Sequence, residues 1–344
     1  MKLTTEQQSA IYQAAKCRTI IDVTPMQSLW AGQGELVRML LSTAERGSAA
    51  EKTKSLVVKQ IIDKPSGGHP RGWNTTLSQQ RKRRSYQVEL HWYRQFASSL
   101  NSAARMPGLV YSEASNHGLL LVLEDLAVDY PVRFTAGQDD RPTDSQIQSC
   151  IHWLAQFHAR TLQHNSEGLW PVGGYWHLDT RPDEWQAMPE GELKRLAGAL
   201  DEQLRACPYQ SIIHGDAKLA NFCFDASGKK VAAVDFQYVG NGPGVKDLML
   251  LLSSVMPDER LVTEAHGWVE YYFEQLSLGL KKWQKGVDAD EVIAAWRPLY
   301  PVAWADFHRF LKGWSPGHWK IGRYCWQESN KCLLEQQGIE RRLV

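Results

Sequence analysis

The sequence lacks the features that would place it among membrane, secreted or disordered proteins. Its longest apolar runs, residues 119–123 and 248–252, are far shorter than the roughly 20 residues that a membrane helix needs. Its six cysteines form no Cys-x-x-Cys pair and no dense framework, which favours a reduced, intracellular chain. The first residues turn polar at once and lack the apolar core of a signal peptide. We therefore expect a soluble, cytoplasmic protein.

An excess of charge of either sign is also missing. Lysine and arginine number 39 against 38 acidic residues, so the formal net charge is +1. Such a balance gives no general electrostatic attraction for nucleic acid or anionic lipid. The one basic run, residues 81–84, is short and is expected to form the solvated face of a helix. We expect neither a nucleic acid nor a membrane as partner, and the sequence does not indicate an oligomeric state.

Tryptophan, in contrast, is abundant. The chain holds 14 tryptophans and 9 phenylalanines among 344 residues. Because the indole ring combines a large apolar face with a hydrogen-bond donor, it suits a pocket for a large, partly apolar ligand, although core packing explains some of these rings. Length and composition indicate a globular chain with one large domain or two lobes.

The first third of the chain is predicted to form a small α+β lobe. Strand-like runs cover residues 19–23, 36–41, 55–62, 109–111 and 118–124. Between the third and fourth runs, apolar residues at 86, 90, 93 and 96 recur at helical spacing. A polar loop over 42–54, a glycine- and proline-containing loop over 63–72 and a turn at 116–118 separate these elements.

The remainder is predicted to be mostly helical, starting near Asp144 with an apolar face over positions 147–158. Residues 164–189, rich in Trp, Gly and Pro, are expected to form a lid or binding loop. Residues 211–214 and 230–235 are expected to pair as short strands. We therefore predict an α+β protein with a mainly antiparallel β lobe over residues 1–126 and a larger, mainly helical lobe over residues 127–344.

The strongest chemical signal is IIHGDAKLANF at 212–222, followed by VAAVDFQ at 231–237. Phosphoryl transfer from ATP needs a carboxylate beside the acceptor hydroxyl and oxygen ligands that hold magnesium across the phosphates. Asp216 would accept the hydroxyl proton, whereas Asn221 and Asp235 offer the hard oxygen ligands that magnesium prefers. Lys218 would reach the transferring phosphate. The structural alternative is a turn in which Asp and Asn cap a helix.

This constellation resembles the protein-kinase-like phosphotransferases. The spelling HGD is similar to the small-molecule branch, which includes aminoglycoside phosphotransferases and choline kinases. DFQ with the following YVGNGPGVKDLMLLLSS is most similar to the ecdysteroid-kinase-like, CHK-type branch. The resemblance extends roughly over residues 32–319. It implies a two-lobed protein-kinase-like fold, with a nucleotide-binding N-terminal lobe and a catalytic, substrate-binding C-terminal lobe, and ATP and Mg²⁺ as cofactors.

The resemblance also implies roles for residues of the first lobe. Lys59, inside an apolar strand, would contact the α- and β-phosphates and pair with Glu89 of the helix; the alternative is a solvated lysine on an edge strand. Gly32 and Gly34 would form the loop over the phosphates, or only a hairpin turn. The backbone from Glu124 to Leu126 would contact adenine.

Two further residues near the catalytic motif are expected to be structural. Asp247 heads an apolar helix and resembles the aspartate that braces the backbone of the catalytic loop in these families. It would also stabilise the start of that helix as a carboxylate at the positive end of the dipole. His214 is expected to form hydrogen bonds near the metal motif, not to act as a nucleophile.

The acceptor is expected to be a small molecule that bears a hydroxyl group. Only twelve residues separate Asp235 from Asp247, too few for the activation segment of a protein kinase. An aromatic wall would enclose the acceptor and would suit a sterol-like or polyketide-like skeleton or a quaternary ammonium group. The candidates are Trp176, Trp185, Trp304 and Trp314, with Trp170, Tyr175 and Trp319 as further members; the alternative for any one ring is core packing.

Other functions stay open at this point. An antibiotic kinase of the aminoglycoside type would use scattered acids such as Asp179, Asp183, Glu184 and Asp306. A non-catalytic nucleotide-binding protein would keep the same fold without turnover. GTP could replace ATP as donor, because backbone contacts to the base leave no side-chain signature.

Overall fold

The computed structural model describes residues 1–29, 32–43, 53–62, 76–115, 118–134 and 141–336. The chain divides into two compact units. The first comprises Met1–Asn101 and Met106–Pro131, and the second comprises Ser102–Arg105 and Val132–Val344. The whole of the loop expected at 63–72, and parts of the loop expected at 42–54 and of the turn at 116–118, lie outside the described residues.

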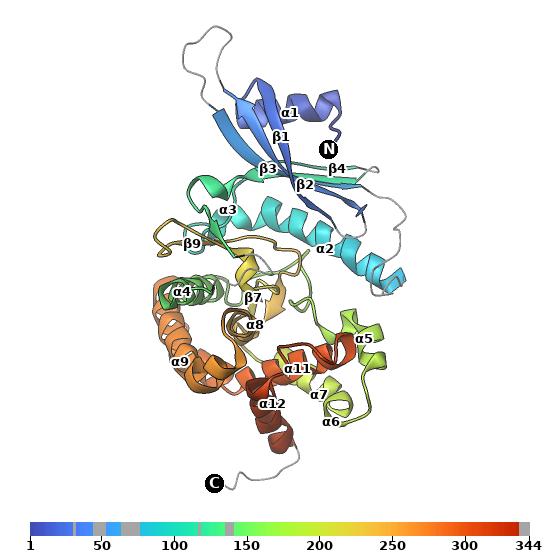
Figure 1. Ribbon diagram of the computed structural model, residues 1–344. Coiled ribbons are helices and arrows are strands. Elements are labelled where there is room, and N and C mark those ends of the chain that lie inside the picture. The colour runs from blue at the N-terminus through green and yellow to red at the C-terminus, as the bar shows by residue number, and fades with distance from the viewer. Residues whose placement is uncertain (30–31, 44–52, 63–75, 116–117, 135–140, 337–344) are drawn as a thin grey trace. The chain divides into compact units, whose positions relative to one another are not determined.

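The first unit is built on a five-stranded antiparallel sheet of order β1-β2-β3-β5-β4 (Figure 1). Its strands are β1 (Thr19–Ser28), β2 (Gly34–Ser42), β3 (Thr53–Ile62), β4 (Leu109–Ser115) and β5 (Gly118–Glu124). Its helices are α1 (Thr5–Ala15), α2 (Thr76–Gln95), α3 (Ala97–Leu100) and a short 3₁₀ turn at Leu126–Val128. The five predicted strands and the long helix are confirmed, with longer bounds for most of them.

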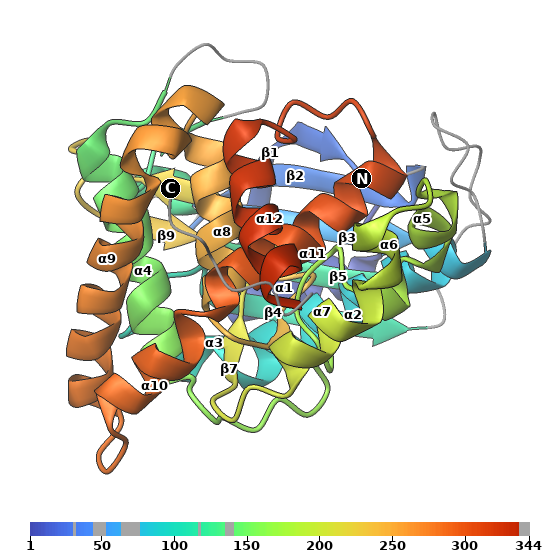
Figure 2. The ribbon, with the colours of Figure 1, turned by 90° about the horizontal axis from the view of Figure 1, so that it is seen from below.

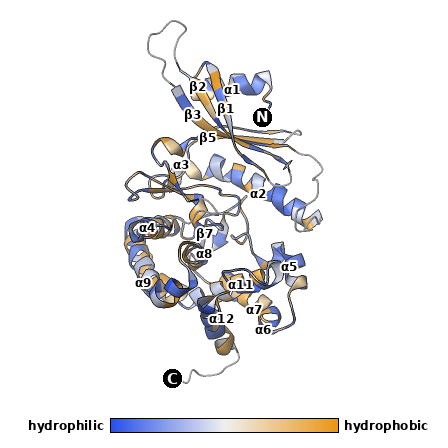
Figure 3. Cartoon of the chain, in the orientation of Figure 1, coloured by the Kyte–Doolittle hydropathy of each residue, from blue (hydrophilic) through white to orange (hydrophobic). Residues whose placement is uncertain are grey.

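Alternation along the strands separates the two faces of this sheet. Val37 on β2 and Val58 on β3 are fully buried with Ile11 of α1 in one apolar cluster. Because successive strand residues point to opposite faces, Lys59 points to the other face, where α2 lies. Figure 3 shows β5 as hydrophobic, whereas α2 is largely hydrophilic.

Helix α1 was missed in the sequence because its residues are mostly polar. Thr4 caps it, with its side chain accepting from the Gln7 backbone N–H while the Gln7 side chain accepts from the Thr4 backbone N–H. Such a capping box specifies the start of a helix even where few apolar residues follow.

The second unit is mainly helical and carries two small sheets. Its helices are α4 (Asp144–Arg160), α5 (Pro182–Ala187), α6 (Glu192–Arg195), α7 (Ala197–Arg205), α8 (Val245–Val255), α9 (Asp258–Trp283), α10 (Ala289–Trp296), α11 (Leu299–Trp314) and α12 (Arg323–Gln336). The sheets comprise β6 (Val132–Arg133), β8 (Phe222–Phe224) and β9 (Val231–Ala233), and β7 (Ser211–Ile213) with β10 (Gly240–Gly242). Short 3₁₀ turns cover Leu178–Thr180 and Leu219–Asn221.

Apolar helix α8 forms the centre of this unit. Every residue from Leu248 to Leu252 is fully buried. Helices α4 and α9 lie side by side (Figures 1 and 2). No helix among the described residues is long and apolar enough to cross a membrane. The predicted α+β class, with an antiparallel sheet in the N-terminal part and a helical C-terminal part, is confirmed.

Two predictions about local structure were wrong. Strand β7 pairs with β10, and β9 pairs with β8, so residues 211–214 and 230–235 do not pair with each other. The segment 164–189 is not irregular throughout, because the 3₁₀ turn Leu178–Thr180 and helix α5 lie within it. The first prediction failed because apolar alternation identifies a strand but does not select the strand with which it pairs. The second failed because Pro182, in the first turn of α5, allows a helix to start within a segment rich in glycine.

Candidate functional site

The loop that follows β7 is held in a conformation that only glycine allows. Gly215 has φ +76°, and a Cβ at this position would lie 2.1 Å from the backbone oxygen of Tyr238. Left-handed backbone and close packing both exclude a side chain here. The glycine of the HGD motif therefore fixes the turn from which Asp216 projects.

Asp247, in the first turn of α8, anchors the same loop. Its Oδ2 accepts from the His214 backbone N–H at 2.6 Å, and its Oδ1 accepts from the Gly215 N–H at 2.9 Å. The His158 Nε2 lies 3.2 Å from Oδ2. Burial tends to raise the pKa of Asp247, but the hydrogen bonds and positive charge around it, led by His158, lower the pKa overall. The carboxylate is thus held ionised beneath the loop.

His214 connects this loop to the strand before Asp235. Its Nε2 lies 3.0 Å from the backbone oxygen of Val234, and its Nδ1 lies 3.2 Å from the Asp216 backbone nitrogen. The carbonyl can only accept and the amide can only donate, so this arrangement selects the neutral tautomer with the proton on Nε2. Both ring nitrogens of His214 are therefore occupied by hydrogen bonds, one within the loop and one that holds the loop against the strand.

The two oxygens of the Asp216 carboxylate have different surroundings. Oδ2 accepts from Lys218 Nζ at 2.9 Å and from Asn221 Nδ2 at 3.1 Å. Oδ1 is buried and has no hydrogen-bond partner among the described residues. Burial raises the pKa of this carboxyl, with the Lys218 charge acting against the rise and the Asp235 charge adding to it. An orphaned buried acceptor of this kind fits a hydroxyl donor from a ligand.

Asn221 and Asp235 offer two further side-chain oxygens at or beside this loop. The Asn221 amide nitrogen donates to the backbone oxygen of Asp216 at 2.8 Å, which directs the amide oxygen to the other side. Asp235 has φ +70°, a conformation that few non-glycine residues adopt and that often marks functional sites. Its Oδ1 accepts from Gln237 Nε2 at 2.5 Å.

The donor set fits magnesium shared with a ligand. No group of three His, Cys, Asp or Glu side chains that could hold a metal occurs among the residues that the structure describes. Magnesium is commonly held by one or two carboxylates together with the phosphates of a substrate, not by a complete protein cage. A carboxylate from Asp235 and an amide oxygen from Asn221 match that requirement.

In the first unit, Lys59 contacts Glu89. Lys59 Nζ lies 2.5 Å from Glu89 Oε2, and both side chains are buried. Lys59 pairs with Leu36 on β2 and Leu121 on β5, so it lies on a central strand and the edge-strand alternative is wrong. Its amine also lies over the Tyr86 ring, 5.3 Å from the ring centroid.

Gly32 lies in the connection between β1 and β2, and Gly34 is the first residue of β2. Gly32 has φ +69° with no atom within 4 Å of a Cβ position, whereas a Cβ on Gly34 would lie 1.9 Å from the Gln60 backbone oxygen. A hairpin turn alone accounts for both glycines, and contact with phosphates stays a prediction.

The predicted adenine-binding segment follows β5. The Glu124 backbone N–H donates to Gly108 O at 2.9 Å, and Leu126 begins the short 3₁₀ turn. Between them lies Asp125, which sequence reasoning missed. It accepts from Arg38 Nε at 2.7 Å and Ser55 Oγ at 2.6 Å. Its role is to tie β2 and β3 to the end of β5.

The tryptophans proposed for the acceptor differ in exposure. Trp176 and Trp304 are fully buried, and the Trp176 Nε1–H donates to Asp306 at 2.9 Å. Trp185 and Trp319 are exposed, and Trp314 is partly exposed and stacks on Phe310 with ring centroids 5.7 Å apart. Trp170 donates to the backbone oxygen of Gln237 at 2.8 Å. Only the exposed rings have surface that a ligand could contact without rearrangement.

Sequence reasoning also missed Lys320, between α11 and α12. Its Nζ donates to Ser253 Oγ of α8 at 3.0 Å, and the charges of Asp216 and Lys218 act on it. Burial lowers its pKa to about 7. No local pattern around Lys320 distinguishes it from a surface lysine, because its neighbours come from distant parts of the chain.

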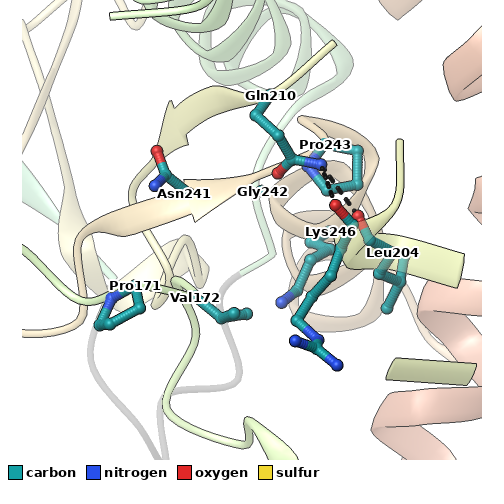
Figure 4. A pocket seen from close by; sticks show the side chains of 9 residues that line it. Pro171, Val172, Leu204, Gln210, Asn241, Gly242, Pro243 and Lys246 are labelled. Atoms are coloured by element: carbon teal, nitrogen blue, oxygen red, sulfur yellow. Dashed lines mark hydrogen bonds between the residues drawn. The ribbon is translucent and has the colours of Figure 1, made fainter. Parts of the chain in front are cut away.

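A separate cavity of about 250 Å³ lies beside β10 and the start of α8 (Figure 4). Asn241, Arg205 and the buried Lys246 are among its lining residues. Lys246 Nζ donates to Gly173 O at 2.8 Å. None of the residues predicted for the site lines this cavity.

Comparison with known proteins gives a family match. The model of the APH phosphotransferase enzyme family matches residues 50–284. A search of curated protein sequences gives no match.

Solved structures also resemble this chain at low identity. An ethanolamine kinase from Plasmodium vivax is 9% identical, with a TM-score of 0.43, and the alignment covers 93% of this chain and 84% of that chain. The bifunctional kinase-methyltransferase WbdD is 12% identical, with a TM-score of 0.35, and the alignment covers 75% of this chain and 46% of that chain.

Proposed function

The chain belongs to the APH phosphotransferase enzyme family, and from this premise we propose that it transfers the γ-phosphoryl group of ATP to a hydroxyl group of a small molecule. The observation that carries the proposal is the Asp216 carboxylate. One of its oxygens is fixed by Lys218 and Asn221, and the other is buried without a partner among the described residues. A carboxylate held in this way is suited to receive a hydroxyl proton.

In this proposal Asp216 is the general base. Its Oδ1 accepts a hydrogen bond from the acceptor hydroxyl and takes the proton as the new O–P bond forms and ADP leaves. Lys218 remains charged, because the attraction of Asp216 outweighs the effect of burial on its pKa. It therefore offers positive charge close to the carboxylate and to a transferring phosphoryl group.

The remaining residues orient the reactants. Asn221 and Asp235 would hold Mg²⁺, which when bound neutralises charge on the phosphates and aligns them. Lys59, paired with Glu89, would bind the nucleotide phosphates, and backbone groups between Glu124 and Leu126 would contact the adenine. His214 and Asp247 would keep the loop in place through the bonds described above.

Several finer assignments belong to the same proposal. The run that starts at Asp235 favours the CHK-type branch of the family. ATP as donor, together with six free, buried cysteines, favours the cytoplasm as location. The acceptor would contact the exposed rings of Trp319 and Trp185 and the partly exposed ring of Trp314.

The test is transfer to a panel of hydroxyl compounds, followed by mass spectrometry for the gain of one phosphate. We expect Asp216→Asn to lower turnover by about 10²–10⁴-fold while ATP binding stays close to that of the wild type. Asp225→Asn is the matched control, because the Asp225 carboxylate accepts from the Lys230 backbone N–H in the β8–β9 turn and has no part in the proposed reaction, so it should leave turnover unchanged.

Full turnover by Asp216→Asn would remove Asp216 from the role of base. ATP binding without transfer to any acceptor, and without hydrolysis by water, would instead favour the non-catalytic alternative. Preferential phosphorylation of aminosugars would favour an antibiotic kinase.

A further inference from the structure

The second unit holds a lysine beside the catalytic loop that the proposed reaction does not use. Lys320 Nζ donates to Ser253 Oγ at 3.0 Å. The next residue of α8, Ser254, accepts through its Oγ from the Leu219 backbone N–H of the loop at 2.8 Å. Adjacent residues of one helix thus hold both Lys320 and the segment that carries Asp216 and Lys218. We propose, on the premise of the proposed function, that Lys320 binds an anionic group of the acceptor.

The bonding of Lys320 leaves it able to bind an anion. A protonated amine has three donors, and Ser253 takes one of them. Among the residues that the structure describes, no carboxylate forms an ion pair with Lys320. The amine lies over two aromatic rings instead, 5.6 Å from the centroid of Phe307 and 5.5 Å from that of Trp319. A partly buried cation in such surroundings is stabilised by an anion that a ligand brings.

Acidic side chains that could attract a cationic acceptor are partly paired within the protein. Glu184 pairs with Arg181 at 2.9 Å, and Asp306 pairs with Arg309 at 2.8 Å. Two of the acids that could have attracted an aminosugar are therefore compensated within the protein.

Aromatic rings near this lysine indicate the body of the acceptor. Tyr175 and Trp314 are partly exposed, and the buried Phe310 packs between them, with ring centroids 5.6 Å from Tyr175 and 5.7 Å from Trp314. The charge of Asp216 acts on the Tyr175 hydroxyl, so this row of rings begins near the proposed base. The acceptor that matches these features is a hydroxyl compound with an apolar or aromatic body and a carboxylate or phosphate group.

A matched series of benzyl alcohols tests the inference. The four probes are 4-(hydroxymethyl)benzoate, 4-(hydroxymethyl)phenyl phosphate, 1,4-benzenedimethanol and 4-(hydroxymethyl)benzylamine. They share a ring and a hydroxyl and differ in charge. Their Kd values are measured by calorimetry with the wild type in the presence of ADP and magnesium. We expect one or both anionic probes to bind at least about tenfold more tightly than the diol, as a charge-assisted hydrogen bond would give, and the amine to bind most weakly.

Variants of Lys320 and of a control lysine, Lys312, show whether the preference for anionic probes depends on Lys320. Lys320→Met should remove the preference for the anion, and Lys320→Arg should keep part of it. Lys312→Met is the matched control, because Lys312 also lies over a tryptophan ring, 5.3 Å from the centroid of Trp326, and should leave the preference intact. None of these variants should change the stabilisation of the protein by ATP and magnesium.

The outcomes separate this inference from the proposed function. Binding of the amine as tightly as the acids, an anion preference that survives in Lys320→Met, or binding of none of the four probes overturns the role of Lys320. None of those results would affect the stabilisation of the protein by ATP and magnesium, on which the proposed function depends. Loss of that response in the wild type would overturn the proposed function and the inference with it.

Discussion

The Asp216 carboxylate has one oxygen that is fixed and one that is left for a ligand. Lys218 and Asn221 donate to Oδ2, which restricts rotation of the group. Because the carboxylate cannot rotate freely, Oδ1 points in one fixed direction. It has no hydrogen-bond partner among the described residues. Such preorganisation lets a base meet its hydroxyl without first rearranging.

The charge on the Lys320 amine makes the proposed binding of an anionic acceptor dependent on pH. Its pKa is lowered to about 7 chiefly by burial, with Asp216 acting to raise it and Lys218 acting to lower it further. Ser253, Phe307 and Trp319 carry no charge, and the one further titratable neighbour named by a contact is His318, whose Nδ1 accepts from the Lys320 backbone N–H at 3.2 Å. Lysine is charged below its pKa, so the affinity for an anionic acceptor is fully present at low pH and decreases as the pH rises through about 7.

We therefore expect the Kd of 4-(hydroxymethyl)benzoate to increase between about pH 6 and pH 9, up to about tenfold per pH unit above the pKa. In Lys320→Arg the increase should disappear from this range, because a guanidinium keeps its proton. Calorimetric titrations across the range measure both profiles. A flat wild-type profile, or the same slope in the arginine variant, would contradict the assignment.

Residues close together in the chain were the ones that the sequence predicted best. Asp216 and Asn221 lie five positions apart on one loop, so their spacing alone brings them together. Lys320 reaches the same surroundings from a connection about a hundred residues later, and only the packing of the helices around α8, α11 among them, reveals it. Local patterns hold no information about such a neighbour.

At the scale of elements, β3 and α2 are joined by a buried charge pair. Lys59 lies on a central strand, and Glu89 lies on the helix that faces that side of the sheet. Removing one member of a buried pair leaves a charge without its partner, whereas replacing both by apolar residues is often neutral. Stability and nucleotide binding can therefore be separated at this pair.

We expect Glu89→Ala to lower the free energy of unfolding by about 3 kcal/mol, and Lys59→Met/Glu89→Leu to recover most of that loss. The double variant should still fail to respond to ATP and magnesium. Urea denaturation and thermal unfolding with nucleotide measure the two effects. Lys54→Met is the control on the same strand, since the Lys54 amine donates to Ala15 O at 3.3 Å and its side chain is exposed. A nucleotide response equal to that of the wild type in the double variant would exclude Lys59 from phosphate binding.

Helices and strands could be predicted from the sequence where one buried face makes apolar residues recur at a regular spacing. The apolar alternation on β2 and β3 and the helical spacing on α2 follow directly from one buried face. Helix α1 escaped because a capping box, not an apolar stripe, specifies it. The partners of β7 and β9 escaped because strands of three residues hold too little pattern to select a register.

At the scale of the whole molecule, the α+β class and the family could be predicted from the sequence. Strands precede helices along the chain, which separates a sheet-based unit from a helical one. The HGD motif already resembles the family because its residues lie in one short, contiguous segment, whereas the CHK-type branch that the DFQ run indicates stays a prediction. The acceptor could not be predicted, since its contacts come from side chains that only tertiary packing collects.

The most direct test of the central claim is thermal unfolding of the wild type with ATP and magnesium, with magnesium alone, and with ATP and EDTA. A ligand at about a hundred times its Kd adds roughly 2.7 kcal/mol to the free energy of unfolding, a readily measured rise in Tm. We expect a rise that needs both ATP and magnesium, that disappears in Asp235→Ala and that persists in Asp225→Asn. No rise with ATP or GTP in the wild type, or an undiminished rise in Asp235→Ala, would contradict it.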